Sequence, residues 1–212
     1  MSGERVWVTA DTHFGHESII KHCNRPFKTI QEMDEYIIEK WNSMIEKYDH
    51  VYILGDFAFN NHLKYINALK GRKHLILGNH DSMSAECLKR FVTVSEEKQI
   101  KYQNRYFILS HCPFRNWTNS YRGSAHLFGH VHGRIKTYNL SFDIGMDTHS
   151  YIPYNMDEVM KMLKDREEMM EKQHRIVADE SGKKTYYQDD VKYLEFIIEK
   201  LRKSNGTANN PA

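Results

Sequence analysis

The chain has 212 residues, and its hydrophobic fraction of 40% and charged fraction of 27% are typical of a globular domain in water. Its formal net charge of +2 is too small to indicate nucleic acid as an electrostatic partner. No apolar run approaches the roughly 20 residues that a membrane-spanning helix needs, so no membrane partner is expected.

The three cysteines, Cys23, Cys87 and Cys112, form no close pair, and their number is odd. This argues against a disulfide framework and for a reducing compartment. The first five residues also lack the apolar core of a signal peptide. We therefore expect a cytoplasmic protein.

The first apolar strand is predicted at residues 6–10, directly before Asp11 and His13. These two residues are two positions apart, so on an extended backbone their side chains point to the same side and can reach one cation. A helix is predicted next. Thr29 and Glu32 have the spacing of a capping box, and apolar residues then recur at helical intervals.

The next two buried strands also end at residues that bind metals or transfer protons. The apolar run 51–54 is followed by a glycine and Asp56. The apolar run 74–77 is followed by a glycine and then by an amide, an imidazole and a carboxylate, namely Asn79, His80 and Asp81. Because sites in α/β sheets are built at the carboxyl ends of strands, these residues are candidates for one site.

Two strands in the second half of the chain end in histidines. The apolar run 106–110 precedes His111, and the run 125–128 precedes His130 and His132, which have glycines on both sides. Further strands are expected at residues 91–94 and 140–147, and a second amphipathic helix follows them.

The expected organisation is one main domain and an extension. Residues 1–173 form the domain, and residues 174–203 form an extension with a hairpin and an amphipathic helix. Residues 204–212 are small and polar and are expected to be disordered.

Five strands thus end in residues of metal-ligand type, with imidazole and oxygen donors but no cysteine ligand. Such a set suits Mn²⁺, Fe, Zn²⁺ or Ni²⁺ better than a structural zinc site built from thiolates. The donors are too many for one ion, so two divalent ions are expected. A carboxylate can bridge two cations about 3.5–4 Å apart, and such pairs serve in-line attack on phosphorus.

The ordered motifs resemble those of the calcineurin-like metallophosphoesterases, in their small bacterial, archaeal and phage form. They are Asp-x-His at 11–13, Gly-Asp at 55–56, Gly-Asn-His-Asp at 78–81, His111, and Gly-His-x-His at 129–132. The resemblance implies an α/β fold with four layers, α/β/β/α, in which two β-sheets form a double sandwich with the two-metal site at the strand ends.

The same resemblance assigns roles to these residues. One ion would be held by Asp11, His13, Asp56 and His132, and the other by Asp56, Asn79, His111 and His130, with Mn²⁺ as the first choice of metal. His80 would be the catalytic histidine, and Asp81 would hydrogen-bond to it and fix its tautomer. A hydroxide bridging the metals would attack phosphorus.

The substrate is less well defined than the metal ligands. Protein phosphatases of this superfamily carry an arginine after the Gly-Asp motif, whereas this chain has Phe57. We therefore expect phosphodiesters or small-molecule phosphates, with a nucleotide as one candidate. The residues considered for substrate contact are Arg115, Trp117, Tyr121 and His16. The alternative is that the aromatic residues of the 113–123 loop pack beneath the site and that His16 packs in its own loop.

Two other functions remain open at this stage. One is a nuclease acting on longer strands, although the small net charge gives it little support. The other is a scaffold that binds metal without catalysis, because a retromer subunit has this fold with its catalytic histidine replaced. His80 is intact here and favours the enzyme.

Overall fold

Two β-sheets form the centre of the computed structural model, which describes residues 4–187 and 194–200. The larger sheet has five strands in the order β4-β3-β2-β1-β9. Their bounds are Val6–Thr9 (β1), His50–Leu54 (β2), Arg72–Ile76 (β3), Thr93–Ser95 (β4) and Tyr154–Asn155 (β9). Strands β1 to β4 are parallel, and β9 is antiparallel to β1.

The smaller sheet has four strands in the order β5-β6-β7-β8. Their bounds are Glu97–Tyr102 (β5), Arg105–Ser110 (β6), Ala125–Phe128 (β7) and Ser141–Asp143 (β8). Strands β6, β7 and β8 are parallel, and β5 is antiparallel to β6. Strand β5 was not predicted, because it is a charged edge strand whose residues alternate between exposed and half-buried.

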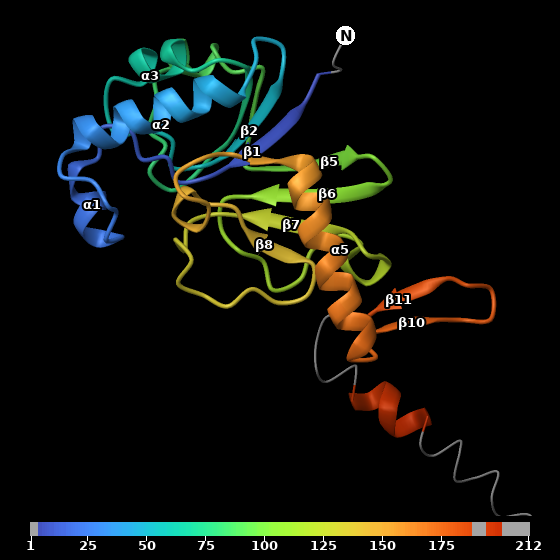
Figure 1. The fold of residues 1–212 in the computed structure, drawn as a ribbon. Helices are drawn as coiled ribbons and strands as arrows, with labels where there is room; N and C mark the ends of the chain where they lie inside the picture. Colours follow the sequence, from blue (N-terminus) through green and yellow to red (C-terminus); the bar gives the residue numbers. More distant parts are fainter. Residues whose placement is uncertain (1–3, 188–193, 201–212) are drawn as a thin grey trace, which may run out of the picture.

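Helices cover the outer face of the larger sheet (Figure 1). They are α1 (Glu17–His22), α2 (Ile30–Met44), α3 (His62–Ala68) and α4 (Ala85–Leu88). Thr29 caps α2 as predicted, since its side chain accepts a hydrogen bond from the backbone N–H of Glu32. The buried stripe of α2 includes Ile37 and Trp41, which pack in one hydrophobic core with Val51 of β2.

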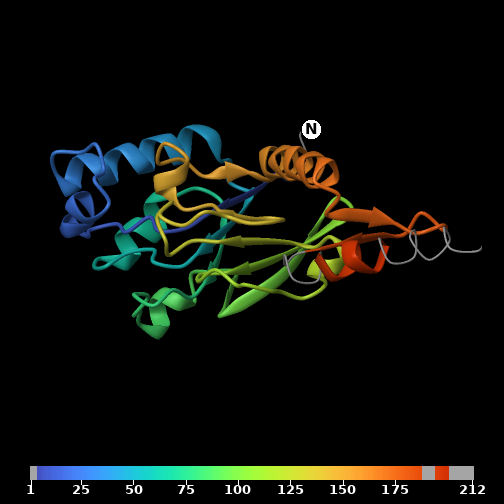
Figure 2. The same cartoon turned by 90° about the horizontal axis from the view of Figure 1, so that it is seen from below.

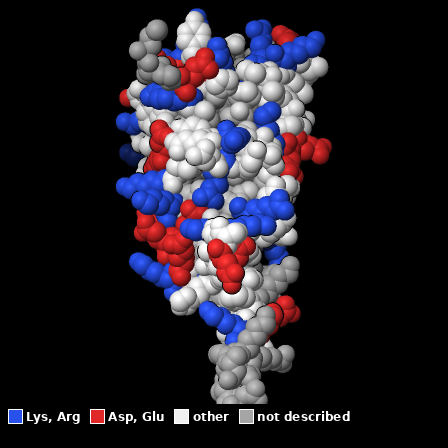
Figure 3. Space-filling view, turned by 90° about the vertical axis from the view of Figure 1, so that its right-hand side faces the viewer, with Lys and Arg blue, Asp and Glu red and all other residues white. Residues whose placement is uncertain are grey.

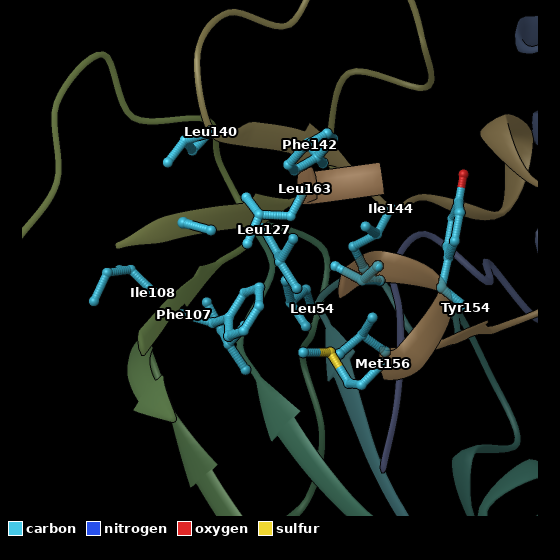
Figure 4. Close-up of a cluster of buried hydrophobic side chains, with 14 of the residues drawn as sticks. Leu54, Phe107, Ile108, Leu127, Leu140, Phe142, Ile144, Tyr154, Met156 and Leu163 are labelled. Atoms are coloured by element: carbon cyan, nitrogen blue, oxygen red, sulfur yellow. The ribbon is translucent and has the colours of Figure 1, made fainter. Parts of the chain in front are cut away.

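A second core fills the space between the two sheets. Figure 4 shows Leu54 of β2, Phe107 of β6 and Leu127 of β7 directed toward one another. Leu163 joins them from α5 (Met156–Lys172), a helix that also contacts β9 and β1. The loop after β6 covers the face of the smaller sheet that carries His126. Its Phe114 ring stacks on the His126 ring with a centroid distance of 5.0 Å. The two sheets, the core between them and the helices on the outside confirm the predicted α/β fold class.

The chain beyond α5 forms a β-hairpin of β10 (Ile176–Ala178) and β11 (Lys184–Tyr186). Figure 2 shows this hairpin at the opposite end of the molecule from α1. Residues 194–200 are helical, whereas the rest of the expected closing helix and the 204–212 tail lie outside the described residues. The division at residue 173 stays a prediction. Among the described residues, no helix combines the length and apolar character needed to cross a bilayer.

We expect Leu127→Ala to lower the free energy of unfolding by about 2–5 kcal/mol, because it leaves a cavity between the two sheets. Leu127 is fully buried, whereas Leu194 is 55% exposed, so Leu194→Ala is the matched control and should change stability by less than about 0.5 kcal/mol. Urea unfolding followed by circular dichroism measures both. Equal effects of the two variants would contradict the assignment of this core.

Candidate metal centre

The loops that follow β1 and β2 are joined by backbone hydrogen bonds beyond the ends of the strands. The N–H of Asp11 donates to Gly55 O, and the N–H of His13 donates to Asp56 O, both at 3.0 Å. The N–H of Phe14 then donates to Phe57 O, also at 3.0 Å. The first two predicted ligand motifs are thus held side by side by the backbone itself.

Five of the seven predicted metal ligands have a left-handed backbone conformation. Their φ angles are +58° at Asp11, +52° at His13, +52° at Asp56, +70° at His130 and +51° at His132. This conformation is unfavourable for residues with a Cβ, and it clusters at functional sites where the surrounding structure enforces it. Each turn redirects a side chain from the strand direction toward the space between the loops.

Gly78 allows the ends of β2 and β3 to come together. A Cβ at Gly78 would overlap the backbone nitrogen and the carboxylate of Asp56. The close approach brings the Asp56 carboxylate within 3.0 Å of the backbone N–H of His80, which donates to it. The glycine that precedes Asn79 in the sequence is therefore required by packing at the site.

Asp11, His13 and His132 form the first cluster of candidate ligands, with one donor atom of each within 4.8 Å of the others. Two atoms of these residues, Asp11 Oδ1 and His13 Nε2, are buried and have no hydrogen-bond partner among the described residues. An unpaired buried acceptor is unfavourable by about 1–3 kcal/mol. A divalent cation bound there would satisfy both atoms, so the first cluster fits a metal ion.

Asp56, Asn79, His111 and His130 form the second cluster. The Nδ1–H of His111 donates to the carbonyl of Leu54 at 2.8 Å, so Nε2 of the neutral ring carries a lone pair. That nitrogen lies 2.9 Å from Asn79 Oδ1, 3.5 Å from Asp56 Oδ1 and 3.2 Å from His130 Nδ1. Acceptors that converge in this way are expected around a bound cation.

Asp56 lies between the two clusters. Its Oδ2 is 3.6 Å from Nε2 of His13 in the first cluster, and its Oδ1 is 3.5 Å from Nε2 of His111 in the second. Each carboxylate oxygen thus faces one cluster. This is the position that a carboxylate shared by two cations requires.

Burial dominates the titration of the first cluster. It raises the pKa of Asp11 well above its usual value and lowers the pKa of His13 to about 2. Burial also disfavours the charged form of His132, but the hydrogen bond to Asp147, the interaction with Cys23 and the charge of Asp11 together outweigh burial and raise the pKa of His132 to about 10. A cation in this cluster would favour an ionised Asp11 carboxylate and a neutral His132 ring, and the His13 ring is neutral without it.

Asp81 differs from its predicted role as the hydrogen-bond partner of the His80 ring. Its carboxylate accepts hydrogen bonds from the backbone N–H groups of Asp56, Phe57 and Gly78 at 2.8–2.9 Å, and no hydrogen bond joins it to the His80 ring among the described contacts. The acid therefore fastens the loop after β2 to the loop after β3. Asp81 takes this role because the ends of β2 and β3 bring three backbone N–H donors close to its carboxylate.

Two supporting groups were missed by the sequence reasoning, since their partners are distant in sequence. Arg25 is buried and donates to the carbonyl oxygens of Asp11 and Thr12, and it forms a bidentate ion pair with Asp147 at 2.7 and 2.9 Å. Asp147 in turn accepts from Nδ1–H of His132 at 2.7 Å. This chain of contacts fixes the ring of a candidate ligand, a common supporting arrangement at metal sites.

The two thiols near the site were also overlooked. Cys112 directly follows His111, and its sulfur lies within 4.8 Å of ligand atoms of His111 and His130. Cys23 lies at the same range from His132 and Asp147. The signal for Cys112 was its position in the sequence beside a predicted ligand.

The family model for calcineurin-like phosphoesterases matches residues 4–196. The chain belongs to this family. An uncharacterised protein of Methanocaldococcus jannaschii is 29% identical over 175 residues, covering 77% of this chain and 93% of that protein. The gene 66 protein of Mycobacterium phage D29 is 30% identical over 199 residues, covering 77% and 98%. A crystal structure of a protein of unknown function from Aquifex aeolicus matches with a TM-score of 0.61 and 26% identity, covering 76% of this chain and all of that one.

Two of the substrate residues expected in this calcineurin-like phosphoesterase lie away from the clusters. Trp117 is 8% exposed and donates its indole N–H to Ser124 O, and its ring lies against His126 of the smaller sheet. Tyr121 lies four residues before the amino end of β7, whereas the candidate ligands follow the carboxyl ends of the parallel strands. Arg115 is exposed.

His80 and His16 both lie at the margin of the first cluster. The centroids of the His80 and His13 rings are 6.3 Å apart, and the His80 side chain is exposed. The His16 ring stacks on Phe59 with a centroid distance of 3.6 Å. The centroids of the Phe59 and His80 rings are 5.2 Å apart. Phe59 was not predicted as a site residue.

We expect the metal-free protein to release protons when Mn²⁺ binds near pH 7. With a pKa of about 10, His132 carries a proton at this pH, and ligation requires the neutral ring. Metal affinity should therefore fall as the pH is lowered. Calorimetric titration in buffers of different ionisation enthalpy measures the protons released.

Asp147→Asn provides the control for this prediction, because it removes the carboxylate that raises the pKa of His132. This variant should release fewer protons per bound ion. Identical apparent enthalpies in all buffers for the wild-type protein would contradict the prediction.

Proposed function

We propose that this protein is a phosphoesterase that uses two divalent metal ions to hydrolyse small phosphodiesters or phosphate monoesters. The observation that supports this most directly is the set of buried acceptors without donors, Asp11 Oδ1 and His13 Nε2, next to the acceptors that converge on His111. These groups come from loops of both sheets and share Asp56 between them. The family to which the chain belongs gives the reaction type.

Asp11, His13, Asp56 and His132 would hold one ion, and Asp56, Asn79, His111 and His130 the other. When bound, the ions would lower the pKa of a water molecule and neutralise charge that develops on the phosphoryl oxygens. The imidazole and oxygen donors suit Mn²⁺, Fe or Zn²⁺, and the two nearby thiols would favour the softer of these.

His80 is the proposed proton donor to the leaving group. Its backbone N–H donates to the Asp56 carboxylate, while its exposed ring lies beside the first cluster, with its centroid 6.3 Å from that of His13. The ring can therefore act on a substrate that approaches from solvent. General acid catalysis of this kind contributes about 10²–10⁴-fold to a rate.

A small substrate is favoured over a long nucleic acid strand. The formal net charge of +2 gives little support to binding along a strand. On the face opposite the α1 side, Lys and Arg side chains are interspersed with Asp and Glu (Figure 3). A basic groove that tracks a backbone is what binding along a strand requires. The exposed Phe59 beside His80 instead offers one aromatic surface, enough for a single base or aryl group.

We expect His80→Ala to bind the same amount of metal as wild type and to lower kcat by about 10²–10⁴-fold, because His80 acts on substrate. Metal content is measured by mass spectrometry of the dialysed protein. Activity is measured on bis-p-nitrophenyl phosphate and p-nitrophenyl phosphate with added Mn²⁺. His22→Ala, which removes another exposed histidine, should leave both measurements unchanged.

Two outcomes would redirect the proposal. Loss of metal in His80→Ala would make His80 a ligand. A wild-type protein that binds metal but hydrolyses neither ester, nor any phosphoester in a wider panel that includes oligonucleotides, would favour a scaffold.

Phe59→Ala should raise KM for aryl and nucleotide phosphodiesters about tenfold relative to dimethyl or glycerol esters, because stacking on a base contributes about 1–3 kcal/mol. Tyr121→Ala removes another exposed aromatic side chain, distant from the clusters, and serves as the control. The comparison of KM across the two substrate classes tests the role. Equal changes in both classes would show that Phe59 acts on the site rather than on the substrate.

A further inference from the structure

His13 uses its two ring nitrogens in different ways. Nε2 is buried, has no hydrogen-bond partner in the described part of the chain and lies 3.6 Å from Asp56 Oδ2, so it faces the proposed metal site. Nδ1 lies on the other side of the ring, 3.2 Å from Nδ1 of His16. The partner of this candidate ligand is therefore a second imidazole.

Two other candidate histidines, His111 and His132, have partners that can only accept a hydrogen bond. His111 donates Nδ1–H to the Leu54 carbonyl, and His132 donates to the Asp147 carboxylate. Both partners can only accept, so in the neutral form of either ring the lone pair lies on Nε2. His16 is different, because an imidazole nitrogen can either donate or accept.

Whether Nδ1 of His16 donates or accepts depends on the metal site. If Nε2 of His13 binds a cation, the proton of the neutral ring must be on Nδ1, and Nδ1 of His16 must accept it. The remaining proton of His16 then lies on Nε2, which is 2.7 Å from the Ser18 hydroxyl. That hydroxyl can accept it, so the whole chain from His13 to Ser18 is satisfied in one arrangement.

The His16 ring is also held in place by packing. The ring stacks on Phe59 with an interplanar angle of 15°. His16 itself is the N-cap residue of α1. The backbone N–H of Phe59 donates to Phe14 O at 2.9 Å, within the paired loops that carry Asp11 and Asp56. A ring fixed on both its face and its edge can impose an orientation on its neighbour.

We propose that His16 is a positioning residue, which accepts a hydrogen bond from Nδ1–H of His13 and thereby keeps Nε2 of His13 free to bind metal. This inference rests on the proposed function, because it requires a metal ion at the first cluster. It assigns His16 to metal binding rather than to the substrate contact expected from the sequence.

Three substitutions at one position separate this role from simple packing. In His16→Asn the amide oxygen stands the same number of bonds from Cα as Nδ1 does, so it can accept from His13. In His16→Gln the oxygen is one bond farther away, and in His16→Ala no acceptor remains. We expect Mn²⁺ affinity to fall about 10–100-fold in the Ala and Gln variants and to stay within about threefold of wild type in the Asn variant.

Mn²⁺ affinity is measured by competition with a chromophoric chelator. His174→Asn, an exposed histidine with a left-handed φ of +57° that asparagine tolerates, is the control and should bind as wild type. Thermal unfolding in chelator shows whether each metal-free variant folds. Where the Ala variant does not fold, the comparison of Asn with Gln carries the test.

A second measurement reads the proton directly. Histidine labelled with ¹⁵N in the Zn²⁺-loaded protein gives the tautomer of each ring by long-range ¹H–¹⁵N correlation. We expect the His13 ring to be protonated at Nδ1 and the His16 ring at Nε2. The opposite tautomer at His16, with Nδ1 protonated, would overturn the inference.

The results distinguish this inference from the function on which it depends. A wild-type protein that binds no divalent ion would remove the basis of both. A wild-type protein that binds metal and hydrolyses phosphoesters, together with equal affinities in the Ala, Gln and Asn variants, would reject only the role of His16.

Discussion

The structure depends on one electrostatic constraint, the convergence of buried acceptors where the ends of two sheets meet. An unpaired buried acceptor costs about 1–3 kcal/mol, and a left-handed backbone at a residue with a side chain costs about 1–3 kcal/mol more. The site contains two such atoms and five such residues. These costs fall on the metal-free protein, and the binding of cations offsets them. The stability of the fold and the occupancy of the site are therefore linked.

Three charged residues hold the strained loops, and each forms hydrogen bonds with backbone groups. Asp81 accepts from three N–H groups of the loops after β2 and β3. Asp143 accepts from the N–H groups of Gly133, which directly follows His132, and of Gly145, which follows β8. Arg25 donates to two carbonyl oxygens of the loop after β1. Because backbone groups are bound, the loop geometry is kept while the candidate ligands remain free for a metal.

The sequence was most informative where structure is local. Apolar runs that end in glycine and a ligand-type residue could be recognised without knowing the sheets, and the Thr29 cap could be read from spacing alone. The partners of Asp81, Arg25 and Asp147 could not, because the residues in these contacts are up to 122 positions apart. Trp117 shows a different limit. Its place follows from the return of the chain to the amino end of β7, which only the strand order reveals.

The site also explains why two packed sheets are needed. Asp11, His13, Asp56 and Asn79 follow strands of the larger sheet, whereas His111, His130 and His132 follow strands of the smaller one. Hydrogen bonds that join these halves include those from His111 Nδ1 to the Leu54 carbonyl and from the His130 N–H to Asp11 Oδ2. Figure 1 shows β6 and β7 directed toward the side of the molecule where α1 lies. The distance between the two clusters is thus fixed by how the sheets pack. Neither half alone could bring Asp56 between the histidines of both.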